Sequence, residues 1–337
     1  SFVSFLEKGV LKGFYFYFFE KNENSITMVL SSLSKKLLKK VSKKELSNTQ
    51  VRKILGYLIP VHSPVSEKNS DRVLCFDNTC EFDDGIVPIS FFSRAESYPL
   101  LECLVLNHKN LDELVFLKEL SQSLEIPLLF SFKKNFSREV YFQYLLEVFR
   151  LHKDGNTLQH IKSTLLDFGF SFSPFDLLDD IGFNTFSFWL NRLGTEGDLV
   201  RHIRIIWSGQ SKIEEQPLSE TPSFEQRVLS YQIAKDHGSS SRRRVEPSDR
   251  INDRCVLTII KASCELYEQG VINSFYHGDY ASVASCGFPD FWGGPFKYCE
   301  TIGMGHIRDL FSSYKTSCGE RFEVPHLLLQ SNSLYES

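Results

Sequence analysis

An internal repeat in the second half of the chain limits its fold more than any other feature. The segment 174–182 begins with Pro-Phe and ends with Asp-Ile-Gly, and 295–303 begins with Pro-Phe and ends with Thr-Ile-Gly at the same spacing. A Gly-Phe pair precedes each copy, at Gly169 and at Gly287. Upstream of each copy, a helical pattern ends near a glycine, the residue that favours a left-handed helix end. The second half therefore predicts two copies of one helical module, packed around an approximate two-fold axis.

The first 131 residues show a different pattern, in which short strand-like runs alternate with helical ones. Residues 14–19 form an aromatic run between Gly13 and a polar stretch, which is typical of a buried strand. This alternation favours an α/β domain, whereas the pattern after Ser137 stays helical. The predicted fold class is therefore α/β followed by all-α. The expected strands are 14–19, 71–76, 87–92, 100–106 and 127–130, and the expected helices are 25–46, 112–125, 145–153 and 259–268.

Two polar stretches predict boundaries within the helical part. Residues 209–223 contain two prolines, and residues 236–253 are rich in serine and arginine. The second stretch is interpreted as a mobile loop, and a partner-binding patch at its arginine run 242–244 is the alternative. The sequence thus predicts three domains, an α/β domain over 1–131 and helical domains over 132–216 and 217–337.

Charge and apolar patterning argue against two classes of function. The 337 residues carry a net charge of −4, which disfavours general nucleic-acid binding. The aromatic run 14–19 is far shorter than the ~20 residues of a membrane-spanning helix, so no membrane span is expected. The eight cysteines form no Cys-x-x-Cys pair and are interpreted as buried thiols of a cytoplasmic protein. The lysine-rich stretch 33–53 is interpreted as a solvated helix face, with a surface that attracts CoA phosphates as the alternative.

The second copy of the repeat carries a family signature. Its segment 287–296 reads Gly-Phe-Pro-Asp-Phe-Trp-Gly-Gly-Pro-Phe. It closely resembles the second helical domain of the 3-hydroxyacyl-CoA dehydrogenase module, and more narrowly that of the α subunit of the multifunctional fatty-acid oxidation complex. The first copy, 145–182, resembles the preceding helical domain. The resemblance implies a truncated Rossmann-like dinucleotide-binding domain before the two copies, with NAD as cofactor, an acyl-CoA as substrate and a thiolase as a candidate partner.

The resemblance extends into the first half, where it assigns positions to the catalytic groups. The segment 90–102 is similar to the family's stretch between a catalytic His and its Glu partner, with Ser90 at the His position and Glu102 at the Glu position. A serine hydroxyl does not ionise near neutral pH, so it cannot replace the imidazole as a base. The family's substrate-orienting Asn falls on Arg138, and a slip in the alignment offers Asn135 instead.

The groups that would bind a dinucleotide are matched only in part. Glu20 lies where the family's second strand ends in a carboxylate that holds the adenosine ribose. A G-x-G-x-x-G turn for the pyrophosphate is absent from the sequence, and counting back from Glu20 places its first two glycines before the first residue. Of the other histidines, His62 and His108 are candidates for a substitute base, while His277 and His306 are interpreted as surface or packing residues.

Three functional hypotheses follow from these residues. The first is a catalytically degenerate relative of the dehydrogenase, retained as a scaffold that binds an acyl-CoA or a protein partner. The second is an active NAD-dependent 3-hydroxyacyl-CoA dehydrogenase of fatty-acid β-oxidation with a substituted base. The third is the product of a decaying gene. Parts of the family's pattern, such as the glycine-rich turn and a segment between Phe76 and Ser90, have no counterpart here, and sequence drift would leave such gaps. Cooperative unfolding without turnover favours the first hypothesis, and oxidation of NADH with acetoacetyl-CoA favours the second.

Overall fold

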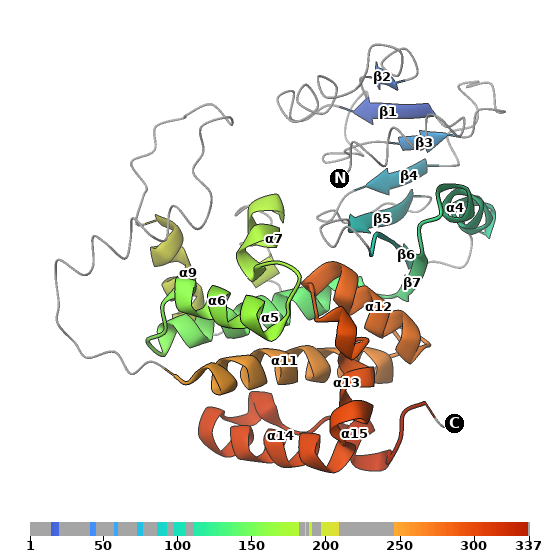
Figure 1. Ribbon diagram of the computed structural model, residues 1–337. Helices are drawn as coiled ribbons and strands as arrows, with labels where there is room; N and C mark the ends of the chain where they lie inside the picture. Colours follow the sequence, from blue (N-terminus) through green and yellow to red (C-terminus); the bar gives the residue numbers. More distant parts are fainter. Residues whose placement is uncertain are drawn as a thin grey trace. The chain divides into compact units, whose positions relative to one another are not determined.

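The chain forms two compact units, which Figure 1 shows as a part rich in strands and a part rich in helices. The first unit comprises residues 1–137 together with 269–277, and the second comprises residues 138–268 and 278–337. The computed structural model describes the backbone of residues 15–19, 41–44, 57–59, 73–76, 86–92, 98–105, 111–181, 186, 189–190, 197–208 and 246–335.

The described strands of the first unit belong to two sheets. They are β1 (Tyr15–Phe19), β2 (Val41–Lys44), β3 (Tyr57–Ile59), β4 (Val73–Phe76), β5 (Ile86–Phe92), β6 (Leu100–Val105) and β7 (Leu128–Phe132). The larger sheet has the order β4-β5-β6-β7, in which only the β5–β6 pair is antiparallel. The smaller sheet has the order β2-β1-β3. Helix α4 (Leu111–Leu124) contacts β7, so strands and a helix alternate along this part of the chain.

The expected strands of the first part are confirmed, but one expected helix is not. The helix predicted over 25–46 is wrong at its end, because Val41–Lys44 pairs as a parallel strand with β1; the rest of that segment lies outside the described residues. The strand Val41–Lys44 has only four residues. The spacing of apolar residues over so short a segment cannot distinguish a strand from a helix. The neighbouring strand β1 decides the outcome by supplying backbone hydrogen bonds to this segment.

The second unit is built around one long helix. Its helices are α5 (Phe136–Lys153), α6 (Leu158–Phe168), α7 (Pro174–Ile181), α9 (Gly197–Ser208), α11 (Ser248–Glu268), α12 (Phe275–Cys286), α13 (Pro295–Ile302), α14 (Met304–Cys318) and α15 (His326–Gln330). Helices α5 and α12 begin in the first unit. Helix α11 contacts α6, α13, α14 and α15, and buried side chains recur along its whole length. It therefore forms the centre of the helical core.

The two helical copies meet through equivalent residues. Phe170 and Phe288 follow the paired glycines of the repeat and contact each other with 5.9 Å between their ring centroids. Each glycine lies against a ring of the other copy, since an added Cβ would lie 2.5 Å from Phe291 in one case and 3.1 Å from Phe172 in the other. Only glycine permits so close an approach. Equivalent phenylalanines therefore meet where the two copies contact each other, and each copy places a ring against the glycine of the other.

One predicted loop differs from the structure. The loop expected over 236–253 is wrong from Ser248 onward, because α11 begins there; residues 236–245 lie outside the described residues. The Pro247 carbonyl accepts the N–H of Arg250 at 3.0 Å, so the proline marks the start of this helix. The N-terminal part of the first unit runs to Ser137, and both helical copies lie in the second unit. The three domains predicted over 1–131, 132–216 and 217–337 stay a prediction.

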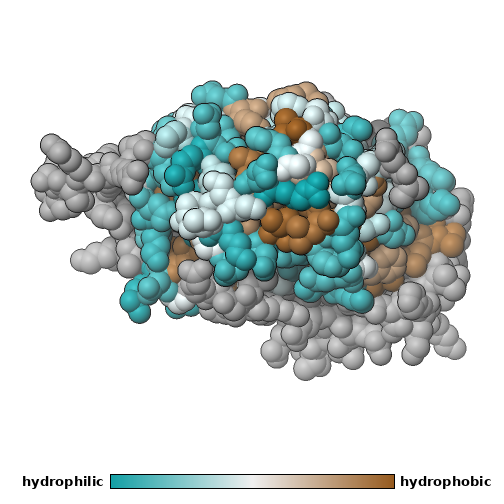
Figure 2. Space-filling view, turned by 90° about the horizontal axis from the view of Figure 1, so that it is seen from below, coloured by the Kyte–Doolittle hydropathy of each residue, from teal (hydrophilic) through white to brown (hydrophobic). Residues whose placement is uncertain are grey.

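The described surface and the described cysteines are ordinary for a globular protein. Figure 2 shows the side of the second unit that carries α14 and α15, where hydrophilic residues predominate and apolar ones form small separate patches. Large exposed apolar side chains occur singly on different elements. Of the described cysteines, Cys318 is half-buried, and the other five are buried free thiols, which confirms their interpretation as buried thiols: Cys103, Cys255, Cys264, Cys286 and Cys299.

Candidate functional site

The sheet of the first unit places Ser90 and Glu102 next to each other. Strands β5 and β6 pair antiparallel, and their register sets Ser90 directly opposite Glu102. Side chains directly opposite each other lie on the same face of a sheet. Ser90 is buried, and Glu102 is fully buried. The two positions that the family resemblance assigns to the His–Glu pair are thus neighbours in this chain.

The carboxylate of Glu102 holds the start of α5. Its Oε1 accepts the Phe136 N–H at 2.6 Å, and its Oε2 accepts the Ser137 N–H at 3.2 Å. The Ser131 hydroxyl also donates to Oε1. Burial raises the pKa of Glu102, and these hydrogen bonds oppose the rise. Glu102 therefore caps a helix N-terminus, where backbone N–H groups lack partners within the helix.

Asn135 completes this group. Its side-chain amide donates to Ser90 Oγ at 3.1 Å, and the residue is buried. Asn135 directly precedes α5 and follows a turn in which Lys133 has a φ of +67°. The Arg138 guanidinium instead lies 3.8 Å from the ring centroid of Trp189. The structure thus brings Asn135 to Ser90, whereas Arg138 contacts Trp189. Arg138 at the family's Asn position, with Asn135 as its alternative, stays a prediction.

Ser131 is the member of the group that sequence reasoning missed. It lies in β7, whose sequence is Leu-Leu-Phe-Ser-Phe, and it is fully buried. A polar residue inside an otherwise apolar strand signals a hydrogen-bond partner, because buried hydroxyls are rarely left unsatisfied. The sequence pattern therefore predicts that Ser131 has a hydrogen-bond partner, but it does not identify that partner. The pairing of β6 with β7 supplies the answer, by placing Glu102 beside Leu129 and therefore near Ser131.

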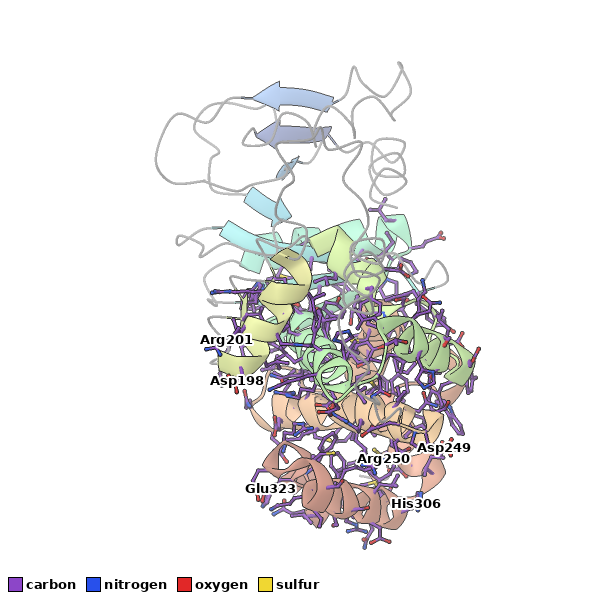
Figure 3. The ribbon with its side chains drawn as sticks, turned by 90° about the vertical axis from the view of Figure 1, so that its left-hand side faces the viewer. Asp198, Arg201, Asp249, Arg250, His306 and Glu323 are labelled. Carbon is purple, nitrogen blue, oxygen red and sulfur yellow. The ribbon has the colours of Figure 1, made fainter. Side chains whose placement is uncertain are left out.

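The remaining sequence candidates lie elsewhere. Glu20, His62 and His108 lie outside the described residues. His277 and His306 are exposed, which confirms their interpretation as surface residues. Figure 3 labels His306 together with Asp249 and Arg250. The charges of all three residues affect the pKa of Asp253. Burial raises the pKa of Asp253, and the Tyr314 hydroxyl and the charges of His306 and Arg250 oppose that rise.

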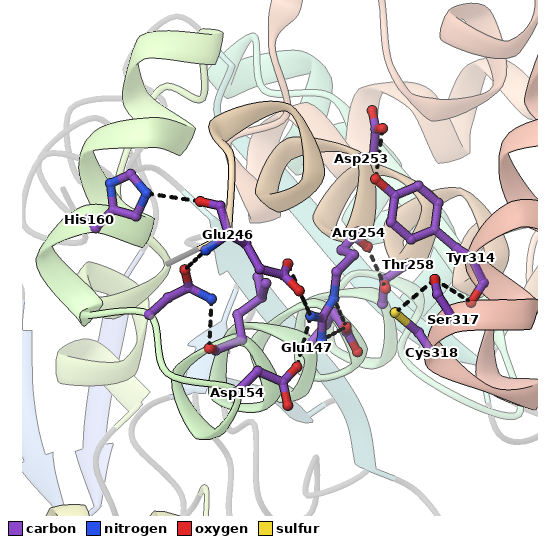
Figure 4. Close-up of polar contacts among 12 residues, drawn as sticks. Glu147, Asp154, His160, Glu246, Asp253, Arg254, Thr258, Tyr314, Ser317 and Cys318 are labelled. Carbon is purple, nitrogen blue, oxygen red and sulfur yellow. Dashed lines mark hydrogen bonds and ion pairs between the residues drawn. The ribbon is translucent and has the colours of Figure 1, made fainter. Parts of the chain in front are cut away.

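The second unit contains a buried ionic cluster that no sequence pattern indicated (Figure 4). Glu147 of α5 is fully buried and accepts Arg254 Nε at 2.7 Å and Arg321 Nε at 2.9 Å. Arg254 Nη1 also lies 2.8 Å from Asp154 and 3.3 Å from Glu246. Burial lowers the pKa of Arg254, but the charge of Glu147 and the hydrogen bonds to Asp154 and Glu147 outweigh it, so the net shift is upward. The cluster is paired internally, which is a structural arrangement.

Among the described residues, the arrangement around Ser90 can bind and orient a polar atom but includes no imidazole that could act as a base. It offers a hydroxyl, an amide and a carboxylate, and the carboxylate is engaged by α5. Within the part of the chain that the structure describes, no three His, Cys, Asp or Glu side chains are grouped so as to hold a metal ion. None of the described helices combines the length and the apolar character needed to cross a membrane.

Comparison with solved structures identifies the fold. The chain matches 3-hydroxybutyryl-CoA dehydrogenase from Escherichia coli K12 with a TM-score of 0.64 and 14% identity, over 97% of this chain and 95% of that chain. This is the 3-hydroxyacyl-CoA dehydrogenase fold. The dehydrogenase part of multifunctional enzyme 1 from C. elegans matches with a TM-score of 0.56 and 15% identity, over 98% of this chain and 86% of that chain. No family model matches the chain.

The 3-hydroxyacyl-CoA dehydrogenase fold agrees with the resemblance carried by 287–296 and with the predicted fold class. Both neighbours align with nearly the whole chain, so the agreement includes the strand-rich part and the helical part. At this level of identity the likeness concerns the fold alone. The chemistry of the Ser90 site is therefore argued from its own residues.

Proposed function

We propose that this chain is a catalytically degenerate relative of the 3-hydroxyacyl-CoA dehydrogenases, retained as a scaffold that binds an acyl-CoA or a protein partner. One observation carries the proposal. Ser90 stands opposite Glu102, where the family resemblance calls for the catalytic His, and Glu102 is engaged by the N–H groups of α5. The site thus keeps its hydrogen-bonding groups without the group that would move a proton.

Proton transfer is the step that the site cannot support. Oxidation of a 3-hydroxyacyl group requires a base that takes the hydroxyl proton as hydride leaves. The Ser90 hydroxyl does not ionise near neutral pH, and Glu102 is fully buried with three donors directed at its oxygens. Loss of a general base typically costs ~10²–10⁴ in rate. Binding without turnover is the function that remains.

The residues that the structure describes do not include the groups that hold NAD in this fold. The sequence contains no G-x-G-x-x-G turn, which would present backbone N–H groups to the pyrophosphate. Glu20, the candidate for the ribose hydroxyls, lies outside the described residues. The proposed function therefore includes no step through NAD. The CoA thioester named for the Escherichia coli neighbour is what supports an acyl-CoA as ligand class, and a thiolase stays a prediction.

The test measures binding and turnover on the same purified chain. We expect calorimetry to detect binding of acetoacetyl-CoA, and we expect no oxidation of NADH in its presence. Asn135→Ala should weaken binding about tenfold, since it removes a buried hydrogen-bonding side chain at the site. Arg201→Ala, on an exposed helix face, is the matched control and should bind like the native chain. Failure of the native chain to bind any CoA thioester would contradict the acyl-CoA part of the proposal.

An active dehydrogenase is the second candidate, because Ser90, Glu102 and Asn135 lie together in one place. If the native chain oxidises NADH with acetoacetyl-CoA and Glu102→Gln abolishes this while remaining folded by circular dichroism, the active-enzyme hypothesis replaces the scaffold. If the chain shows no cooperative unfolding transition, both candidates fail and the decaying-gene hypothesis stands.

A further inference from the structure

The C-terminal residues 331–335 are pinned to the second unit by polar contacts. The Ser333 hydroxyl donates to Glu300 Oε1 at 3.1 Å, and the Leu334 N–H donates to the same oxygen. The Tyr335 hydroxyl donates to Asp279 Oδ2. The Lys297 ammonium lies 5.2 Å from the centroid of the Tyr335 ring. A segment without regular structure is thus held at two carboxylates, and we call residues 331–335 the strap.

Asp279, which holds the end of the strap, also caps α13. Its Oδ1 accepts the Phe296 N–H at 2.7 Å, and its Oδ2 accepts the Lys297 N–H at 3.2 Å. Gly294, with a φ of +117°, packs so closely that an added Cβ would lie 2.5 Å from the Asp279 Cα. The same carboxylate therefore serves a helix N-terminus and the strap, and its backbone neighbour leaves it little room to move.

Asp279 is the group of this cluster that changes charge near neutral pH. Burial raises the pKa of Asp279 to about 7. The hydrogen bonds from Tyr335, Phe296 and Lys297 and the charge of Lys297 lower the pKa and so oppose this rise. Among the described residues, the thiols of Cys264 on α11 and Cys299 on α13 also lie close enough to feel the charge of Asp279. Burial and the negative charge of Asp279 raise the pKa of both thiols, so they stay protonated.

We propose that residues 331–335 form a pH-dependent strap, which ionisation of Asp279 tightens and protonation of Asp279 loosens. The Tyr335 hydroxyl donates to this carboxylate, and a hydrogen bond to an ionised acceptor is about twice as strong as one to a neutral acceptor. Docking of the strap and ionisation of Asp279 are coupled, and such coupling is reciprocal. Because the docked strap stabilises the ionised carboxylate, ionisation of the carboxylate stabilises the docked strap. When Asp279 is protonated, the Tyr335 hydrogen bond is weaker, and the strap keeps its contacts to Glu300 and Lys297.

The size of the effect follows from the population of the ionised form. A carboxyl group that titrates near pH 7 is about nine-tenths ionised at pH 8 and about one-tenth ionised at pH 6. If docking follows the ionised form, the protection of the strap falls by up to about tenfold between these two pH values. The strap is independent of the Ser90 site, so its test stands whatever ligand that site binds.

Hydrogen–deuterium exchange of the full chain tests the strap, read by mass spectrometry on the C-terminal peptide and corrected for the intrinsic pH dependence of exchange. We expect protection of residues 331–335 to be several-fold greater at pH 8 than at pH 6. Tyr335→Phe removes the donor without touching the α13 cap, so its protection should be low and equal at both pH values. Tyr276→Phe alters an exposed tyrosine outside the strap and should behave like the native chain.

A second variant separates the strap from the stability of α13. Asp279→Asn keeps the side chain's size but cannot ionise, so protection of the strap should lose its pH dependence even where the unfolding temperature falls. Equal protection of the native strap at both pH values, greater protection at pH 6, or a pH dependence that survives in Tyr335→Phe would each overturn the proposal.

Discussion

Glu102 in the first unit and Glu147 in the second are both fully buried, yet each is stabilised by a different means. Glu102 receives two backbone N–H groups and a hydroxyl, which carry only partial charges. Glu147 receives the guanidinium groups of Arg254 and Arg321, which carry full charges. Burial removes Glu102 from water, which disfavours its ionised form. The partial charges of its hydrogen-bond donors offset only part of this cost, so the pKa of Glu102 is raised.

The comparison separates a buried carboxylate that is held by partial charges from one that is held by full charges. A buried carboxyl group without a full countercharge has a perturbed pKa, which is typical of functional sites. A carboxylate matched by arginines holds elements of the fold together. The chain keeps the first kind at Glu102 but sets Ser90 beside it, so that glutamate also serves the fold by holding the start of α5.

Breaking the ionic cluster should have the largest effect on stability. Arg254→Met removes the closest countercharge of Glu147 and leaves Asp154 and Glu246 without this partner. We expect a loss of up to about 3–5 kcal/mol in the free energy of unfolding, because Glu147 loses its most buried countercharge and keeps only the more exposed Arg150 and Arg321. Urea-induced unfolding measures it. Arg254→Lys, which retains the charge, should lose less; equal losses would mean that packing rather than charge decides.

Asp279 extends the comparison to a second carboxylate that caps a helix. Its pKa is raised from 3.8 to about 7 in the folded chain, so the folded state binds more protons than the unfolded state between these values. This contribution to stability is full below pH 3.8 and is lost as pH rises through 7. From pH 5 to pH 8 the native chain should lose about 2–3 kcal/mol more than Asp279→Asn. Parallel stability profiles of the two proteins would contradict this.

Glu102→Gln sharpens the comparison in the first unit. Glutamine keeps the shape but brings an NH₂ group towards donors that need an acceptor, so one N–H of α5 loses its partner. We expect a loss of about 1–3 kcal/mol in the free energy of unfolding, smaller than that of Arg254→Met because no charge is left unpaired. The deficit should shrink as pH rises, since the raised pKa of Glu102 stabilises the fold on the acid side. A deficit that grows with pH would show that the ionised form is favoured.

An exposed ion pair gives the smallest expected effect. Arg201 Nη1 lies 3.8 Å from Asp198 Oδ1, and both side chains are about three-quarters exposed; Figure 3 labels both residues on α9. Arg201→Ala should change the free energy of unfolding by less than about 0.5 kcal/mol, because solvent screens the pair. A loss comparable to that of Arg254→Met would mean that burial does not govern the strength of these pairs.

The fold was largely predictable, because local patterns set most of its elements. The aromatic run at β1 and the glycines after α6 and α12 signal their structure directly. The sequence does not predict the start of α11 at Ser248, although Pro247 marks it. The serine- and arginine-rich composition of the stretch around it is typical of a loop. Strand β2 could not be predicted, since only pairing with β1 makes it a strand.

The candidate site was predictable only in outline. The resemblance assigned Ser90 and Glu102, and the register of β5 and β6 brings them together. That Asn135 contacts Ser90 while Arg138 contacts Trp189 depends on where α5 begins, which an alignment cannot resolve to one residue. The ion pair of Glu147 and Arg254 joins residues 107 positions apart, and no local pattern indicates such a pair.

By itself the sequence determined the order of the elements, the helical repeat and the absence of an imidazole at the Ser90 position. These depend on side-chain identity and on periods of a few residues. Only the tertiary structure decided the partners of the buried carboxylates and the exchange of rings between the two copies. Those contacts depend on strand register, on helix starts and on how faces from distant parts of the chain meet, and each buried carboxylate needs its donors at hydrogen-bonding distance.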